Sequence, residues 1–110
     1  MPKGEFLGEF EQFVLLALMR LGKDAYGMKV RQEIDQRTGR ETAIGAVYAT
    51  LDRLEQKGLV QSVVVESNAE SGGRARRFYE ITPQGIDSLR QSREAIAKLM
   101  EGLEGQWQER

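Results

Sequence analysis

Basic residues gather at two places in this sequence, and both groups are suited to binding phosphate. The first group is Arg74, Arg76 and Arg77, which follow the pair Gly72 and Gly73. Arginine offers a planar fork of donors that matches phosphate and guanine, and glycines let a chain approach another backbone closely. The group predicts contact with nucleic acid. The alternative is a solvated loop tip whose positive field two nearby glutamates weaken.

The second group lies on one sector of a helix predicted over residues 44–57. At 100° per residue this sector holds very small residues followed by two cations, namely Gly45, Ala46, Ala49, Thr50, Arg53 and Lys57. The small residues would let the helix enter a groove, where Thr50 and Arg53 would reach base edges or phosphates. Base readout and phosphate contact both stay open for Arg53, and a solvated face with Arg53 paired to a neighbouring acid is the alternative.

Residues for covalent or metal chemistry are scarce. The chain has no cysteine and no histidine, which excludes disulfides, thiolate nucleophiles, imidazole bases and the usual transition-metal ligands. The carboxylates Glu5, Glu9 and Glu11 near the N-terminus could act as acids or bases, but they have no partner nucleophile or metal set. We therefore predict no catalytic activity, no cofactor and no metal site.

Length and charge restrict the partners. The 110 residues, 40% of them hydrophobic, fit one domain with one core. The net charge of -1 counts against nucleic-acid binding, although residues 40–77 carry six cations against five anions and leave -2 elsewhere. Because this gradient is slight, binding would rely on a two-site dimer. The absence of a signal sequence and of an apolar stretch of roughly 20 residues predicts a cytoplasmic protein without membrane partners.

The elements that must position these residues follow from hydrophobic spacing. Apolar residues recur at three and four over residues 6–21, 24–39 and 44–57, which predicts three helices. Each is followed by a glycine suited to end it, namely Gly22, Gly39 and Gly58. Asp24 is the expected N-cap of the second helix. Residues rich in β-branched and aromatic types over 59–65 and 76–82 predict an antiparallel hairpin with a long loop.

A last helix is predicted from Thr82 and Pro83 to about Trp107. Its seam is apolar except at Arg93, and the predicted dimerisation residues are Ile86, Leu89, Ile96, Leu99, Met100, Leu103 and Trp107. A helix of ~25 residues, ~37 Å long, exceeds what so small a domain covers, so its distal half should pack on a second copy; the alternative is that the seam covers the protein's own core. Trp107 and Met100 could also form the floor of a groove that binds a flat aromatic effector. The alternative is that the tryptophan only packs in the dimer contact.

This order of elements predicts an α+β, mainly α fold: a winged helix-turn-helix over residues 1–82, made of three helices and a two-stranded β-hairpin wing. Residues 83–110 form the long C-terminal dimerisation helix, in the same structural unit. In such a fold the third helix enters the major groove and the wing reaches the adjacent backbone or minor groove. Two-fold pairing would set the third helices ~34 Å apart and predicts a pseudo-palindromic operator on double-stranded DNA.

Further contacts follow from this placement. Tyr48 borders the buried arc, so its hydroxyl could meet a phosphate, although a core tyrosine is equally compatible. Tyr26 and Gly27 lie in the first turn of the second helix, where free N–H groups suit a phosphate, and Lys29 adds charge unless it is only solvated. Arg76 and Arg77 alternate, so one of them should reach DNA. The DNA-binding candidates are Tyr26, Gly27, Lys29, Gly45, Ala46, Tyr48, Ala49, Thr50, Arg53, Lys57, Gly73, Arg74 and Arg76.

Four stretches resemble the PadR family: LLAL at 15–18, DAYG at 24–27, GAVYATLDRLEQKGL at 45–59 and RFYEITPQG at 77–85. The resemblance covers roughly residues 7–103. It implies a repressor-like transcriptional regulator of the short-tailed branch, whose single C-terminal helix serves homodimerisation and whose relatives include some that respond to phenolic acids or multidrug-like compounds. The alternative is a winged-helix module that binds protein instead of DNA, and the salt dependence of binding separates the two.

Overall fold

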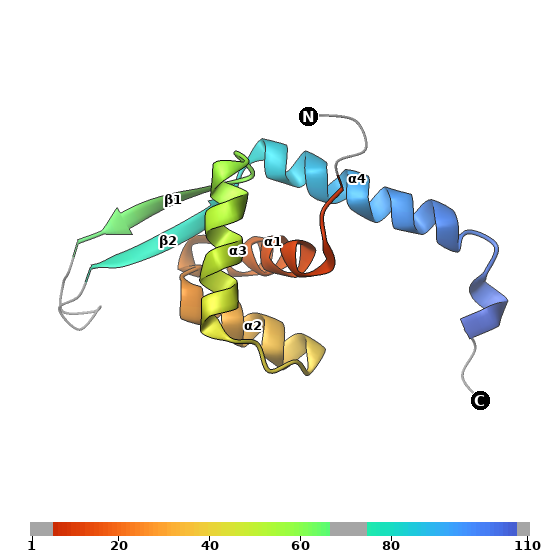
Figure 1. Ribbon diagram of the computed structural model, residues 1–110, viewed down its shortest axis with the longest axis horizontal. Coiled ribbons are helices and arrows are strands. Elements are labelled where there is room, and N and C mark those ends of the chain that lie inside the picture. The colour runs from red at the N-terminus through yellow and green to blue at the C-terminus, as the bar shows by residue number, and fades with distance from the viewer. Residues whose placement is uncertain (1–5, 67–74, 108–110) are drawn as a thin grey trace.

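The computed structural model describes residues 6–66 and 75–107. Its elements follow the predicted order (Figure 1). They are α1 (Glu9–Leu21), a 3-10 turn η1 (Gly22–Asp24), α2 (Gly27–Thr38), α3 (Ile44–Gln56), β1 (Val60–Val65), β2 (Arg76–Ile81), α4 (Pro83–Met100) and a 3-10 turn η2 (Glu104–Trp107). The predicted α+β, mainly α fold with a hairpin is confirmed. Gly73 and Arg74 lie outside the described residues.

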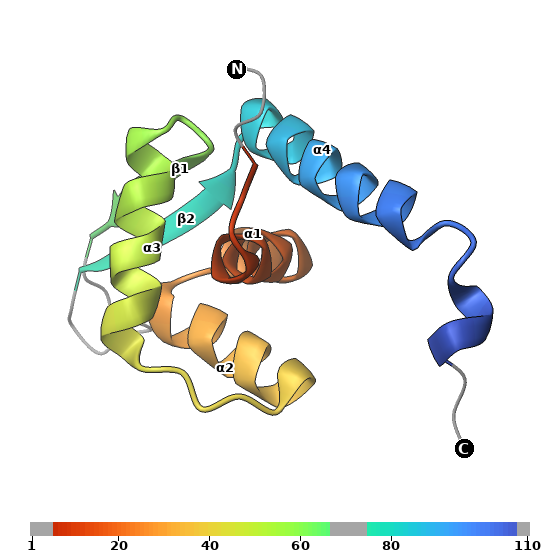
Figure 2. The ribbon, with the colours of Figure 1, turned by 45° about the vertical axis from the view of Figure 1, so that its right-hand side comes forward.

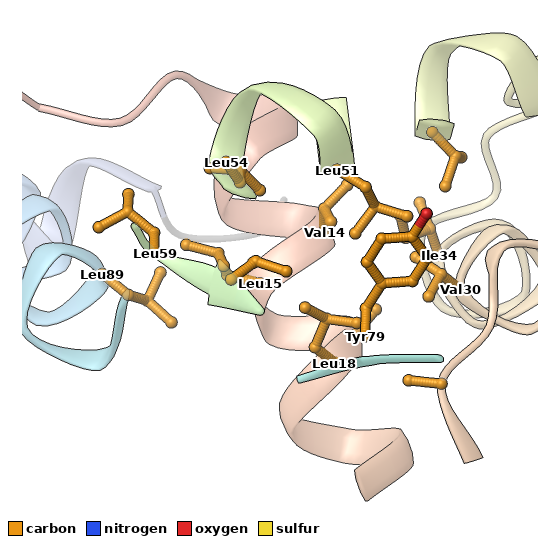
Figure 3. Packing of buried hydrophobic residues seen from close by; sticks show 14 of the residues in the cluster. Val14, Leu15, Leu18, Val30, Ile34, Leu51, Leu54, Leu59, Tyr79 and Leu89 are labelled. Carbon is orange, nitrogen blue, oxygen red and sulfur yellow. The ribbon is translucent and has the colours of Figure 1, made fainter. Parts of the chain in front are cut away.

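The core is built around α1. Helices α2, α3 and α4 and strand β2 all contact it, and side chains from these elements converge on Val14, Leu15 and Leu18 (Figure 3). Leu15 is fully buried, although it lies outside the stripe that the three-and-four spacing predicts. That stripe consists of Phe6, Phe10, Phe13, Val14, Ala17, Leu18 and Leu21. A helix that is covered on several sides buries a wider arc than one amphipathic face, which explains the difference. Phe6, predicted as helical, precedes α1 and is exposed.

Glycines end α2 and α3 as predicted. Gly39 follows α2 with φ 78° and Gly58 follows α3 with φ 80°, a region that other residues rarely adopt. The predicted N-cap Asp24 is wrong: Asp24 belongs to η1, and Tyr26 is the extended residue before α2. Residues 25–26 are extended because they pair with the hairpin, so the helix begins only at Gly27.

The hairpin is fastened to this extended segment. Strands β1 and β2 pair antiparallel from Val60 opposite Ile81 to Val65 opposite Arg76. The backbone N–H of Tyr79 donates to the carbonyl of Ala25 at 2.8 Å. The middle of the hairpin is therefore fixed relative to the start of α2.

Helix α4 starts as predicted but ends early. The Thr82 hydroxyl accepts from the Gly85 N–H at 3.0 Å and donates to the Gly58 carbonyl at 2.8 Å. The helix stops at Met100, seven residues before the predicted Trp107, and Gly102 follows with φ 83°. Gly102 and the next glycine, at 105, have poor helix propensity, so the chain turns and continues as η2.

Segments far apart in the chain are joined by buried hydrogen bonds beside α4. The Leu7 N–H donates to Ser92 Oγ at 2.9 Å, and the Gln12 amide donates to the Leu7 carbonyl at 3.2 Å. The first bond ties the segment that precedes α1 to the middle of α4, and the second ties it to α1.

The molecule is elongated. Figure 2 shows α3 on one side of α1 and the end of α4 extending away on the other. The radius of gyration is 16.1 Å, against about 13 Å for a compact domain of this length. Within the described ranges, no helix combines the length and the apolar character that a membrane span requires.

Candidate nucleic-acid interface

The face of helix α3 opposite the core is exposed and carries mostly small side chains; we call it the open face of α3. Val47, Leu51 and Leu54 are fully buried on one side. Residues on the other side are exposed, namely Gly45, Ala46, Ala49, Asp52 and Gln56. A Cβ added to Gly45 would meet nothing within 4 Å. Small side chains on this face would let the helix axis come close to another surface.

The first turn of α2 lies against α3. A Cβ on Gly27 would overlap the ring and the hydroxyl of Tyr48, so the Tyr48 ring lies directly against the Gly27 backbone. Tyr48 remains 42% exposed and is therefore not a plain core residue. Gly27 itself is buried, so at the start of α2 the surface is formed by the Tyr48 ring and hydroxyl that lie over it.

Aromatic and basic side chains meet beside β2, in the half of the hairpin nearer its loop. The Arg76 guanidinium carbon lies 3.9 Å from the Tyr26 ring centroid, and the rings of Tyr26 and Phe78 make an edge contact at 5.7 Å. Arg77 points to the other face of the hairpin, where its Nη1 donates to Ser62 Oγ at 3.0 Å. The predicted alternation of Arg76 and Arg77 agrees with this arrangement.

Thr50 does not lie where the sequence predicts. It is 3% exposed, so its predicted position on the outward face is wrong and its side chain has no route to a base edge. On a helical wheel Thr50 lies at the edge of the sector of small and basic residues. Neighbouring elements pack against that edge of α3, so Thr50 is buried.

Arg53 and Lys57 are exposed, and both contact one acid. Arg53 Nε lies 3.4 Å and Lys57 Nζ 3.0 Å from Glu11 Oε2. Arg53 Nη2 also donates to the Thr50 hydroxyl at 3.3 Å. The pairing of Arg53 with a neighbouring acid, the alternative from sequence, is therefore present in this structure.

Glu11 is held at the start of α1. Its Oε1 accepts from the Gly8 N–H at 2.9 Å, and its side chain is only 10% exposed. Burial raises the pKa of Glu11, but the Gly8 N–H, Lys57 and Arg53 outweigh burial and hold the pKa below its usual value. Glu11 therefore stays ionised beside the two cations.

Lys29 contacts Asp24 of η1. Its Nζ lies 3.2 Å from Asp24 Oδ2, and the two side chains are 40% and 61% exposed. Exposed pairs of this kind contribute roughly 0–1 kcal/mol, so Lys29 can exchange this partner for a phosphate at little cost.

The predicted dimerisation residues divide into two sets. Leu89 is 5% exposed and belongs to the core of its own chain, so its predicted place on a partner surface is wrong. The remaining residues are all exposed, namely Ile86, Ile96, Leu99, Met100, Leu103 and Trp107. Five of these lie beyond the part of α4 that packs on the core.

Three structural features were missed from sequence: Glu11 as the partner of two α3 cations, Asp52 on the open face of α3, and Ser92 as a buried acceptor. A glutamate three residues after an N-cap position is typical of a capping arrangement, and this signal could have placed the side chain of Glu11. Nothing in the sequence pairs it with Arg53, 42 residues away.

Comparisons with known proteins agree with the fold. Residues 15–91 match a family model described as Transcriptional regulator PadR-like family. The chain is 30% identical over 106 residues to an uncharacterized protein X of Lysinibacillus sphaericus, covering 88% of this chain and 93% of that protein. It is 38% identical over 76 residues to the transcriptional regulator Rv3488 of Mycobacterium tuberculosis, covering 69% of this chain and 66% of that protein. It is also similar to the crystal structure of a PadR family transcription regulator from Clostridium difficile R20291, with TM-score 0.67, 29% identity, and coverage of 87% of this chain and 98% of that one.

Proposed function

This chain belongs to the transcriptional regulator PadR-like family, and from that membership we propose that it binds a specific double-stranded DNA operator as a homodimer and acts as a repressor. The observation that carries the DNA contact is the open face of α3 beside the first turn of α2. Gly45, Ala46 and Ala49 would enter the major groove, with Tyr48 at the border of that face. No catalytic step belongs to this function.

The remaining contacts surround this face. Tyr48 and Lys29 would hold one phosphate at the start of α2, beside the buried Gly27. Arg53 and Lys57 would approach the backbone at the far end of α3, and Arg76, stacked on Tyr26, would act from the hairpin. Thr50 is not part of this interface because it is buried.

The dimer in this proposal is formed by the distal part of α4 and by η2. Ile96, Leu99 and Met100 are exposed on the last two turns of the helix, and Leu103 and Trp107 continue the apolar surface. Exposed apolar side chains that gather in one part of a molecule are typical of a surface that a partner covers. The elongated shape is compatible with the same dimer, because a second copy would cover the exposed apolar side chains of α4 and η2. Residues 1–82 would then form the DNA-binding part and 83–110 the dimerisation part of one unit.

A small aromatic effector would bind in the same dimer contact, beside Trp107 and Met100, and would change the spacing of the two α3 helices. Titration of the protein with phenolic compounds, followed by Trp107 fluorescence, tests this part. A quench that saturates and is accompanied by a change in operator affinity supports it.

Selection of duplex DNA from genomic fragments by the purified protein tests the main proposal. The expected result is an enriched inverted repeat whose binding weakens steeply with added salt, because phosphate contacts release counterions. Arg76→Ala should bind it less tightly, and Gln91→Ala on α4 should not. No enrichment at low salt would contradict DNA recognition and favour a module that binds protein.

A further inference from the structure

One buried carboxylate organises both cations of α3. Glu11 Oε2 faces Lys57 Nζ and Arg53 Nε, while Oε1 accepts the Gly8 N–H. The anion is covered, whereas the side chains of Arg53 and Lys57 are 53% and 38% exposed. The acid therefore lies behind the cations and is itself shielded from an approaching polyanion.

Arg53 is held at two points. Its Nε faces Glu11, and its Nη2 donates to the hydroxyl of buried Thr50 at 3.3 Å. A long side chain fixed in this way has less rotamer freedom to lose when it binds. The orientation of its guanidinium is set before DNA arrives.

Glu11 also changes the local charge. Together with Arg53 and Lys57 it gives +1 where the two cations alone would give +2. Binding to unrelated DNA follows the number of phosphates that a protein neutralises. Removal of the acid would strengthen that general attraction.

We propose that Glu11 is a positioning residue that sets DNA specificity: it fixes the arrangement of Arg53 and Lys57 on α3 and offsets one of their charges, which favours the operator over unrelated DNA. The proposal rests on the DNA-binding function proposed above. Glu11 itself makes no contact with DNA and acts through the two cations.

A neighbouring acid provides a matched control. Glu9 lies on the same turn of α1, and its carboxylate pairs with Arg40 Nη1 at 2.9 Å. Arg40 precedes α3 and does not belong to it. The change Glu9→Gln therefore removes the same charge from the same turn without touching Arg53 or Lys57.

The experiment measures the affinity of each variant for the enriched operator duplex and for an unrelated duplex at several salt concentrations. Glu11→Gln should raise affinity for the unrelated duplex by about threefold to tenfold at low salt and steepen the salt dependence. The ratio of operator to unrelated affinity should fall by about tenfold. Glu9→Gln should leave that ratio unchanged.

Glu11→Asp separates orientation from charge. It keeps the negative charge but is one methylene shorter, so the unrelated duplex should bind as in the wild type and the operator more weakly. Thermal unfolding of each variant checks that it is folded. An unchanged ratio in Glu11→Gln, or an equal loss on both duplexes, would overturn the proposal. If the wild type enriches no duplex, the DNA-binding function itself fails, which is a different outcome.

Discussion

The ring of Tyr48 occupies the space that a side chain at Gly27 would need. The contact joins the start of α2 to the open face of α3, and the backbone of α2 has little freedom to move away. A Cβ at Gly27 would therefore force the half-exposed Tyr48 ring to turn away from α2.

Gly27→Ala should displace the Tyr48 ring and, because that ring is 42% exposed and can turn outward, destabilise the protein by about 1 kcal/mol, the low end of the cost of overpacking. Denaturant unfolding measures this change. Gly45→Ala is the matched control, because nothing lies within 4 Å of its added methyl, and it should be neutral or stabilising by up to ~1 kcal/mol. Combining Gly27→Ala with Tyr48→Ala should recover part of the loss, and no recovery would mean that the ring is not the obstacle.

Gly85→Ala should be more damaging. Its added methyl would overlap the Leu59 carbonyl oxygen and Cγ1 of Ile81, and the carbonyl belongs to a backbone already bonded to Thr82. We expect a loss of about 3 kcal/mol in the free energy of unfolding. Gly105→Ala, whose methyl would meet no atom, should leave the unfolding midpoint in place. Equal unfolding midpoints for Gly85→Ala and Gly105→Ala would contradict the close contact between Gly85 and the Leu59 carbonyl.

Ser92→Ala should remove the acceptor of the buried Leu7 N–H. Leaving a buried donor unsatisfied costs about 1–3 kcal/mol, so the midpoint of urea unfolding should fall and amide exchange at Leu7 should accelerate. Gln91→Ala, one residue earlier on the exposed side of α4, is the control. Unchanged exchange at Leu7 would mean that the hydrogen bond does not hold this segment in solution.

Leu99→Glu should weaken the proposed dimer. Leu99 is 80% exposed, so a charge there costs little in the single chain but would be buried without a partner between two copies. Sedimentation equilibrium should show a shift toward monomer. Val63→Glu places the same charge on an exposed valine of the hairpin and should sediment as the wild type does. A dimer that tolerates Leu99→Glu would place the contact elsewhere.

The stability of the protein should fall in acid partly through Glu11. Burial raises the pKa of Glu11, but the Gly8 N–H and the two cations together lower it by more. The pKa in the folded protein therefore lies below the usual 4.5. The resulting stabilisation is complete above the unfolded pKa and is lost as pH falls through the folded one. Glu11→Gln should show a smaller loss of unfolding free energy between pH 6 and pH 3, as set by these pKa values. Parallel pH curves for the two proteins would exclude a stabilising charge at Glu11.

Much of the fold is readable from sequence because it depends on local properties. Apolar spacing places α1, α2 and α3 within a few residues, and Gly39 and Gly58 mark helix ends through their own backbone freedom. The hairpin follows from β-branched and aromatic runs. The small-residue face of α3 is also visible, because residues on one helix share a fixed geometry.

Other features were decided only by the tertiary structure. Leu15 and Thr50 are buried because several elements cover their helices, and Leu89 lies inside its own core because α4 first crosses α1. The pairing of Glu11 with Arg53 joins positions 42 apart. Sequence periodicity tells which residues of one element share a face. Which faces meet depends on how whole elements pack to bury apolar surface, and that is settled only when all of them are in place.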